Sequence, residues 1–537
     1  MTPTRNPLHP STLGLVGRAR HTLVAAAVAT ALGVFSVPAM SADSADLQGL
    51  QDQINKLQRE MDRMKAQQAQ QPQATPAPAA TAAAKPASGA AAAPTFMAGP
   101  VKVTLGGFVE LMVVNRDRNE SADWASNFNT AIPYPNSHNH YISEFHLTER
   151  QSRLAALAQG PDNEEWATES YVEMDFGGAG GTANYNESNS FSPRVRHFFA
   201  DVTYKPWGGN LLFGQTWSLI TGNKQGIVAR GENIPATIDG QYVPGFNWLR
   251  TPQIRFTKKF NDMVTAAVSV ENPAVLVSGT AVAGTIYNNP GAGNSFTPPN
   301  GGTFSSNNVT LDYLPDFVAK VAIDPGFGHY ELFATERFFR ARDIITGQQT
   351  NVKTNGTGFG GNLILPVVPK MVDFQASMIA GRGVGRYGSA QLPDATIDPG
   401  AERGLEPLRG FSALAGLVIK PAPAWTLYGY VGEEQVSKAS WNVTAGGKTV
   451  AYGYGNPLYD NSGCFAEGGT ACAANTSRIV SGTLGGWWKF YSGWLGNAQV
   501  GLSDTWIKRE IFSGVGGDPN TNINIALVSF RYYPFQK

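Results

Sequence analysis

The chain has little charge. Aspartate, glutamate, lysine and arginine make up 15% of its 537 residues, whereas ordinary soluble domains carry roughly 25%. Glycine, asparagine, serine and aromatic residues are abundant instead. This composition suits a barrel with one face toward lipid and the other toward water. The 41 basic and 41 acidic side chains balance, so the net charge gives no indication of nucleic-acid binding.

Long apolar runs and catalytic patterns are also missing. Beyond the N-terminal leader, no segment offers the roughly 18 apolar residues that a membrane-spanning helix needs. The seven histidines are scattered, and no glycine-rich phosphate loop follows a strand and opens a helix. His138 and His140 could hold a metal ion, but a solvated loop is the simpler interpretation. The sequence therefore predicts neither an enzyme nor a cofactor or metal site.

Cysteine is nearly absent. Cys464 and Cys472 are the two cysteines of the chain, and both lie in a segment rich in glycine, alanine and asparagine. Their close spacing predicts one small disulfide-closed loop, formed in an oxidising compartment. Two free thiols are the alternative.

The N-terminal part has three predicted segments. Residues 1–42 are typical of a secretory signal peptide, because Arg18 and Arg20 precede an apolar run and small residues follow it. Residues 43–65 carry a heptad seam that predicts a parallel coiled-coil oligomerisation helix in the periplasm, although the seam is too short to be stable alone. The apolar positions of this seam are Leu47, Leu50, Ile54, Leu57, Met61 and Met64. Residues 66–99, rich in alanine, proline and glutamine, predict a flexible linker.

From residue 100 to residue 537, strand-length segments are separated by gaps that are alternately short and long. Short turns are predicted at 159–165, 206–209, 260–262, 324–327, 367–370, 421–423 and 492–496. Long loops are predicted at 116–142, 177–193, 219–248, 272–308, 341–354, 383–405, 439–477 and 510–521. An even number of strands, with both ends on the short-turn side, is typical of an outer-membrane barrel with periplasmic termini. We therefore predict an all-β fold, a 16-stranded antiparallel transmembrane barrel around an aqueous channel.

Side-chain alternation within the segments agrees with a barrel. In 251–259, Ile254 and Phe256 share one face, whereas Arg255 and Lys259 share the other. Segments 309–323 and 371–381 alternate in the same way. A basic group placed in lipid at mid-depth costs roughly 2–4 kcal/mol. The polar face is therefore expected to line water, and the interior to be wet throughout.

The third long loop, 219–248, is the candidate for a constriction. It follows the fifth predicted strand and contains Lys224, Arg230, Glu232 and Asp239. Folded inward, it would narrow the channel and set its selectivity with these charges. The alternative is a loop that projects outward.

Basic residues along the predicted wall are candidates for lining the pore. They are Arg150, Arg153, Arg194, Arg196, Arg255, Lys259, Arg337, Arg382 and Arg386. Guanidinium groups pair bidentately with carboxylates, so a ladder of them would favour dicarboxylates or other small anions. A regular pleat, however, turns Arg194 and Arg196 outward unless a bulge intervenes near His197. Acidic residues are also expected inside, so a weakly selective pore remains the alternative.

Five motifs in order resemble the DcaP-type porins, a family of trimeric outer-membrane channels for dicarboxylate uptake. They are SPRVRH at 192–197, GQTWS at 214–218, PQIRFT at 252–257, ENP at 271–273 and GRGVGRY at 381–387. The resemblance implies a trimer, a sixteen-stranded barrel and uptake of small organic anions. It also implies a pore role for Arg194, Arg196 and Arg255.

The sequence thus predicts a homotrimeric porin in a bacterial outer membrane that admits small anionic solutes, such as dicarboxylates, by passive diffusion. A weakly selective or phosphate-type porin is the alternative within the same class. Alternatives from other classes are a structural or adhesive barrel with a plugged lumen and an outer-membrane hydrolase.

Overall fold

The computed structural model describes residues 94–124, 128–178, 191–280, 282–287, 311–344, 349–400 and 403–536. The predicted signal peptide (1–42), the predicted heptad helix (43–65) and most of the predicted linker (66–99) lie outside the described residues. The end of the linker is described, and it forms strand β1 (Thr95–Ala98), which pairs with the start of β2 (Val101–Arg116). Among the described residues, no helix is long and apolar enough to cross a membrane.

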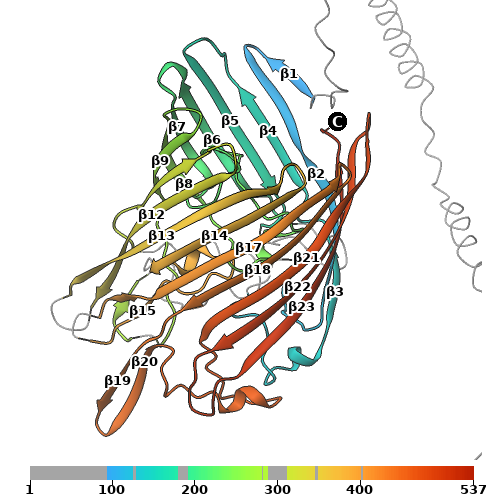
Figure 1. Ribbon diagram of the computed structural model, residues 1–537. Helices are drawn as coiled ribbons and strands as arrows, with labels where there is room; N and C mark the ends of the chain where they lie inside the picture. Colours follow the sequence, from blue (N-terminus) through green and yellow to red (C-terminus); the bar gives the residue numbers. More distant parts are fainter. Residues whose placement is uncertain are drawn as a thin grey trace, which may run out of the picture. The chain divides into compact units, whose positions relative to one another are not determined.

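The wall is a closed ring of antiparallel strands in which each strand is hydrogen-bonded to the next along the chain (Figure 1). β3 (Glu144–Thr148) and β4 (Arg153–Gln159) both pair with β2 and form two parts of one wall strand. The others are β5 (Trp166–Asp175), β6 (Arg194–Tyr204), β7 (Gly209–Trp217), β8 (Arg250–Lys259), β9 (Val264–Glu271), β11 (Asp316–Ile323), β12 (His329–Asp343), β13 (Asn351–Val368), β14 (Val372–Arg382), β17 (Arg409–Ala422), β18 (Trp425–Val436), β21 (Thr476–Gly493), β22 (Gly496–Ile511) and β23 (Asn520–Tyr533). β2 pairs with β23 to close the ring. The predicted 16-stranded antiparallel barrel is confirmed.

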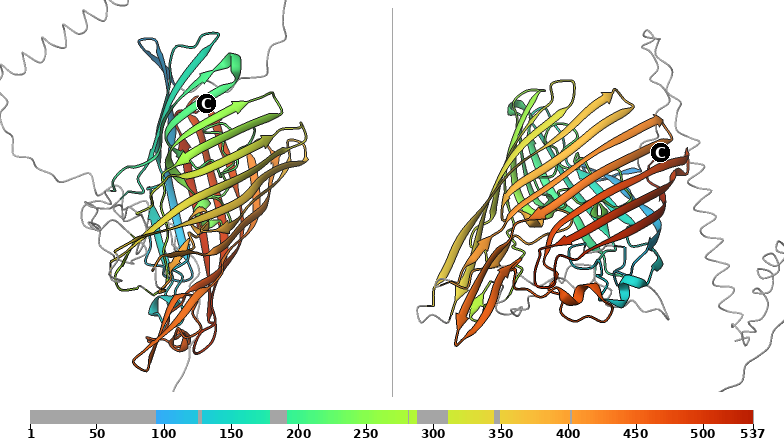
Figure 2. Two further views of the ribbon diagram at one scale, coloured as in Figure 1. Left: turned by 90° about the vertical axis from the view of Figure 1, so that its left-hand side faces the viewer. Right: turned by 60° about the horizontal axis from the view of Figure 1, so that its bottom comes forward.

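The connections follow the predicted short and long alternation. All seven predicted short turns join neighbouring wall strands at one end of the barrel, and the wall strands that flank the eight predicted long loops meet those loops at the opposite end (Figure 2). Two long loops are shorter than predicted, 344–350 and 512–519, because β12, β13 and β22 extend further.

The long loops and turns carry short elements of their own. They are β10 (Thr285–Ile286), β15 (Ala395–Ile397), β16 (Leu405–Pro407), β19 (Ala439–Ala445), β20 (Lys448–Tyr454) and the 3₁₀ turns η1 (His138–Tyr141), η2 (Lys205–Trp207), η3 (Gly240–Tyr242), η5 (Gly385–Tyr387) and η6 (Ser462–Phe465). Cys464 and Cys472 form the predicted disulfide at η6.

The two faces of the wall differ as the alternation predicts. On β11, Phe317 and Val321 are exposed on the outer face, whereas Asp316 and Lys320 are buried on the inner face. The same alternation runs along β12, β22 and β23. Apolar side chains therefore form the outer surface, as contact with lipid requires.

The interior is not wet throughout, and this expectation was wrong. On the side formed by β2, β18 and β21–β23, inward side chains such as Ile479, Ile507 and Ile525 are apolar and buried. They pack against Trp124 and Phe128 of segment 117–143 and against residues of segment 218–249. The loops supply the second layer that these apolar side chains need to escape water. One half of the barrel interior is therefore a hydrophobic core.

Gly214 on β7 provides a test of the wall packing. It has φ of +124°, and a Cβ atom there would lie 2.3 Å from the carbonyl oxygen of Phe198 on β6. We expect Gly214→Ala to cost at least about 1 kcal/mol of stability through backbone strain and this collision. The temperature at which the folded band is lost on semi-native gels should fall. Gly482→Ala on β21 is the control, because a Cβ atom there meets nothing within 4 Å; equal temperatures for the two variants would contradict the packing.

Candidate functional site: a constriction formed by an inward-folded loop

Segment 218–249 lies inside the barrel and is hydrogen-bonded to one side of the wall. The Asn223 N–H donates to Glu331 Oε1 on β12 (3.0 Å), and the Ala236 N–H donates to the Tyr430 hydroxyl on β18 (3.1 Å). From β21, Trp487 Nε1 donates to the Ala236 carbonyl (2.8 Å). From β23, Arg531 Nη2 donates to the Ile238 carbonyl (2.8 Å). The segment thus narrows the interior mainly from the side of β12–β23. It also reaches the opposite wall, where Gln151 Nε2 donates to Asp239 Oδ2 (2.7 Å) and Arg230 lies 4.5 Å from the centre of the Tyr171 ring of β5.

Glu434 of β18 ties this segment to another loop. Its Oε1 accepts from the Gly245 N–H (2.8 Å) and from the Ala390 N–H of segment 383–408 (3.0 Å). The Ser389 hydroxyl donates to the same oxygen (3.3 Å) and also to the Val243 carbonyl (2.9 Å). A buried carboxylate that accepts several N–H groups is a strong tether, because hydrogen bonds to charged groups contribute about 1.5–3 kcal/mol each.

The wall opposite the loop presents arginines because two strands depart from a regular pleat. The register between β5 and β6 shifts so that Glu173 lies opposite His197 and Met174 opposite Val195, which leaves Arg196 as the extra residue of a bulge. Arg194 and Arg196 therefore both point inward. At 149–152 the chain turns, with the Ser152 N–H donating to the Glu149 carbonyl (2.9 Å). This interruption lets both Arg150 and Arg153 face the interior.

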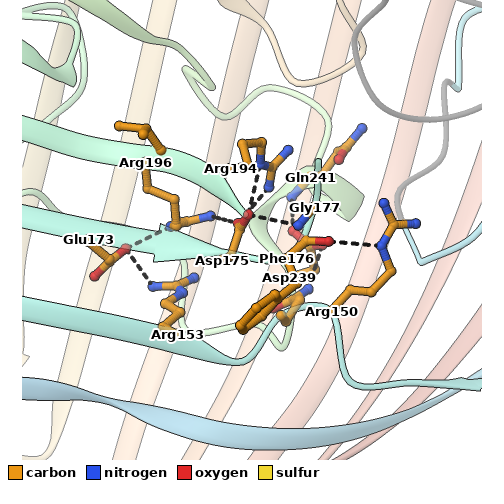
Figure 3. A network of polar contacts seen from close by, with 12 residues as sticks. Arg150, Arg153, Glu173, Asp175, Phe176, Gly177, Arg194, Arg196, Asp239 and Gln241 are labelled. Carbon is orange, nitrogen blue, oxygen red and sulfur yellow. Dashed lines mark hydrogen bonds and ion pairs between the residues drawn. The ribbon is translucent and has the colours of Figure 1, made fainter. Parts of the chain in front are cut away.

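The inward arginines form a network with two carboxylates of β5 (Figure 3). Asp175 accepts from Arg194 Nε (2.9 Å), Arg194 Nη2 (2.6 Å) and Arg196 Nη1 (2.8 Å). Glu173 accepts from Arg196 Nε (2.7 Å) and lies 3.5 Å from Arg153 Nη1. The pairs are mostly buried, and each guanidinium charge lies beside a carboxylate. Three guanidinium groups share two carboxylates, so the network adds donors to the wall and keeps one net positive charge.

Between this network and segment 230–240 lies a hollow of about 390 Å³, which we call the constriction pocket. Its charged lining comprises Arg153, Arg196, Lys224, Arg230, Arg531, Glu173, Glu232 and Asp239. The five basic groups exceed the three carboxylates by two. Lys224 and Arg230, both exposed on the loop, form no ion pair in the part of the chain that the structure describes. Lys224 and Arg230 are matched in number by Glu232 and Asp239 of the same loop, so the excess of two comes from the wall, where Arg153, Arg196 and Arg531 stand against Glu173.

Three other predicted pore residues face inward outside this pocket. Arg255 is buried beneath the loop, where its Nη2 donates to the Trp217 carbonyl (2.6 Å). Lys259 lies near the short-turn mouth and pairs with Asp262 (2.7 Å) in water. Arg255 and Lys259 line a second hollow, of about 750 Å³, on the short-turn side of the loop. Arg150 binds Asp123 and the carbonyls of Phe176 and Gly178, so loops cover it.

Three predicted pore residues do not line the channel. Arg382 points outward, because β14 alternates and Arg382 has the parity of exposed Met378; it pairs with Glu406. Arg337 is fully buried beneath loops, paired with Asp316 (3.2 Å) and Asp394 (2.7 Å). Arg386 is buried at the same place. Arg337 and Arg386 hold loops against the wall, since each donates to the Ala274 carbonyl.

Several residues of the site were not predicted. Arg531 on β23 shares the inner face with Ser529, and its Nε lies 2.9 Å from Glu110 Oε2. Alternation with exposed Phe530 was a signal that could have identified it. Arg250, the first residue of β8, lies over the rings of Trp217 (4.6 Å) and Trp248 (5.1 Å). By alternation along β8, Arg250 would share the outer face with Ile254, yet its side chain points inward. The sequence pattern therefore did not identify it as a residue of the site.

The two loop carboxylates of the pocket are held in surroundings that disfavour their charge. Burial raises the pKa of Glu232, and the nearby Arg255 offsets this in part. Burial also raises the pKa of Asp239, despite the Gln241 N–H (2.8 Å) and the charges of Arg196 and Arg194. Both groups therefore take up a proton at a higher pH than an exposed carboxylate does.

Comparison with solved structures finds outer-membrane channels. The outer membrane channel DcaP of Acinetobacter baumannii is 16% identical, with 82% of this chain and 100% of that chain covered and a TM-score of 0.54. OmpT of Vibrio cholerae (10% identity, 82% and 100% covered) and an anion-selective porin from Comamonas acidovorans (10%, 81% and 99%) have TM-scores of 0.42. No protein-family model and no curated protein sequence matches the chain. The resemblance to DcaP-type channels predicted from five motifs is thus confirmed at the level of the fold.

The Glu434 tether can be tested by proteolysis. Glu434→Ala leaves the Gly245 and Ala390 N–H groups without their acceptor, so segment 218–249 should detach more often. We expect trypsin to cleave after Lys224 or Arg230 about tenfold faster, which corresponds to about 1.4 kcal/mol. Glu433→Ala is the matched control, since the neighbouring Glu433 points outward and pairs with Arg478. Equal cleavage of both variants would show that Glu434 does not hold the loop.

Proposed function

We propose that this chain is an outer-membrane porin through which small organic anions diffuse passively. The observation that carries the proposal is the constriction pocket, whose lining has five basic groups against three carboxylates and where Lys224 and Arg230 of the inward-folded loop form no ion pair among the described residues. An anion crossing the pocket meets these two groups on one side. On the other side it meets the paired guanidinium donors of Arg153 and Arg196.

Dicarboxylates suit this arrangement best among small anions. One carboxylate can contact the loop cations while the other accepts from the guanidinium groups of the wall, whose planar geometry matches a carboxylate. The paired arginines are already neutralised, so they would bind weakly enough to release the solute, as conduction requires. The DcaP protein of Acinetobacter baumannii, which is described as an outer membrane channel, has a comparable barrel.

Assembly and location belong to the same proposal. The apolar outer wall and the gathering of all short turns at one end support a bacterial outer membrane location, with the short turns on the periplasmic side. The heptad positions in 43–65 support a homotrimer in which short parallel helices add to contacts between barrels. The signal peptide and the disulfide loop are consistent with export to an oxidising compartment.

A structural barrel without an open pore is the second candidate. It is favoured by one observation, the apolar packing of segments 117–143 and 218–249 inside the barrel. Single-channel steps in a planar bilayer would exclude it, whereas a protein that inserts and never conducts would support it.

Removal of the loop cations should reduce anion selectivity. For Lys224→Gln with Arg230→Gln, we expect the chloride-to-potassium permeability ratio to fall about fivefold, the factor for about 1 kcal/mol of charge interaction. Reversal potentials in a salt gradient measure this ratio. Lys258→Gln with Arg342→Gln removes two outward-facing cations and should leave the ratio unchanged. A cation-selective wild-type channel would overturn the proposed preference.

Acidification should increase anion selectivity. The pKa values of Glu232 and Asp239 are raised, so as pH falls through them two negative charges disappear while the arginines and lysine keep theirs. The change should begin above the pH of about 4 at which exposed carboxylates titrate. Reversal potentials between pH 8 and pH 4 should show it, and Glu232→Gln with Asp239→Asn should abolish most of it. Selectivity that stays constant or falls on acidification would contradict the assignment.

A further inference from the structure

The outer wall carries two pairs of like charges near the long-loop end. Arg382 on β14 lies directly opposite Arg409 on β17, and Arg340 on β12 lies directly opposite Lys353 on β13. All four side chains share the outward parity of their strands. Like charges placed directly opposite each other destabilise a sheet. A source of negative charge beside them would relieve this repulsion.

Among the residues that the structure describes, one of the four cations has an ion-pair partner. Arg382 pairs with Glu406 (2.5 Å), whereas Arg409, Arg340 and Lys353 form no ion pair with any residue that the structure describes. Arg340 Nε donates to the Leu311 carbonyl (2.6 Å), and Lys353 Nζ lies 4.5 Å from the centre of the Tyr313 ring. Glu336 is the outward carboxylate of β12, and it accepts from the Thr357 hydroxyl (2.7 Å). Among the described residues, three of the four cations thus have no carboxylate partner.

An apolar groove begins next to the Arg382–Arg409 pair. It is a hollow of about 910 Å³ in the outer wall, and it follows two neighbouring rows of paired residues across β11–β18. One row contains Leu332, Gly361, Met378 and Ala413, and the second contains Leu363, Ala376 and Ala415. Glycine and alanine leave room above the sheet, and larger apolar side chains border it, together with the Glu433 carboxylate, which is paired with Arg478 (2.7 Å). Met378 and Ala413 lie four positions from Arg382 and Arg409, about 13 Å toward the short turns.

We propose that this surface binds one molecule of a phosphorylated, acylated glycolipid of the outer leaflet, with lipopolysaccharide as the biological example. The phosphates bridge Arg382 with Arg409 and Arg340 with Lys353, and an acyl chain lies in the groove. The inference rests on the proposed outer-membrane location, which places the long-loop end at the outer surface. Charge complementarity selects this occupant, because a lipid with an anionic headgroup presents charge and hydrocarbon in the same vertical order as the cations and the groove.

The surface carries two separate pairs of basic side chains, and this favours a lipid headgroup with two phosphates. Lys353 lies five positions along β13 from Gly358, which pairs with Gly381, the neighbour of Arg382. The two like-charge pairs are therefore separated by roughly 15 Å along the strand direction, within reach of long basic side chains from both sides. A free phosphate ion could bridge one pair but would leave the groove empty.

Native mass spectrometry of the full-length protein in detergent tests the proposal with purified diphosphoryl lipid A as the probe. We expect bound lipid A on the wild type and about tenfold weaker binding to Arg409→Gln. Ala413→Phe, which fills the groove from the lipid side, should weaken lipid A binding by a similar factor. Lys258→Gln removes an outward cation at the short-turn end and is the matched control. Equal binding by all four proteins would overturn the proposal.

Further probes separate the sources of phosphate and the possible occupants. Monophosphoryl lipid A should bind more weakly than the diphosphoryl form, and deacylated headgroup or inorganic phosphate should bind weakest; equal binding of inorganic phosphate would overturn the acyl groove. A change of oligomeric state in lipid-free detergent caused by Ala413→Phe would instead identify an interface between copies of this chain and overturn the lipid assignment.

The melting temperature provides a second test, because the effect of Arg409→Gln on it should differ between lipid-free protein and protein with lipid A. Without lipid, Arg409→Gln removes a like-charge repulsion, so its melting temperature should equal or exceed that of the wild type. With lipid A added, the wild type should gain stability and the variant should not. A variant that is less stable than the wild type without lipid would show a structural role and overturn the proposal. Conductance in bilayers of uncharged lipid tests the porin proposal separately, so the two can fail independently.

Discussion

The ring of hydrogen bonds between strands is the constraint on which the rest of the structure depends. Hydrocarbon offers no partner to a backbone N–H or carbonyl group, so each must be satisfied within the wall. The pairing of β2 with β23, from Val109 opposite Tyr532 to Arg116 opposite Ile525, removes the last free edges. Closure imposes the two-residue period of a strand on the wall. That period puts apolar side chains toward lipid and leaves the inner positions free to vary.

The inward-facing positions of the strands carry apolar side chains on one side of the barrel and charged side chains on the other. Around β21–β23 they carry isoleucine and leucine, and the loops pack on them as a soluble core would. Around β4–β8 they carry arginine, glutamate and aspartate, which face the constriction pocket. The apolar half determines where the loops lie, because a loop with Trp124, Phe128 and Tyr242 loses water-exposed apolar area only on that side. The polar half is left open as a consequence.

Strand number, turns and most faces could be predicted from the sequence because each depends on local spacing. The two-residue period of a strand also places Arg382 on the same outer face as Met378, which argues against the pore-lining role predicted for Arg382. What local spacing cannot reveal is an irregularity of the pleat. The bulge at Arg196 and the interruption at 149–152 decide that four arginines face inward, and both depend on pairing with distant strands and on ion pairs with Glu173 and Asp175.

Arg337 shows that alternation can predict which face a side chain lies on but not which residues it contacts. Its inward parity was correct, yet its partners, Asp316 and Asp394, come from β11 and from a loop that no periodicity places. An inward arginine can therefore either line the channel or hold a loop in place. The distinction depends on tertiary contacts. Infolding of segment 117–143 was missed for the same reason, since its apolar residues follow no strand period.

In the proposed porin, the basic groups of the pocket that lack an ion-pair partner among the described residues lie on a loop rather than on the wall. Wall arginines are neutralised by carboxylates of neighbouring strands, and a buried pair that exchanges its partner for a solute gains little. Lys224 and Arg230 have no such carboxylate partner in the described residues, although Arg230 lies 4.5 Å from the centre of the Tyr171 ring, so under the proposed function a solute anion would displace no carboxylate there. Their position is set by backbone contacts of segment 218–249 with Tyr430, Glu434 and Trp487. It follows that a substitution at these inward residues, remote from the pocket charges, can change selectivity by moving the cations without altering any charge.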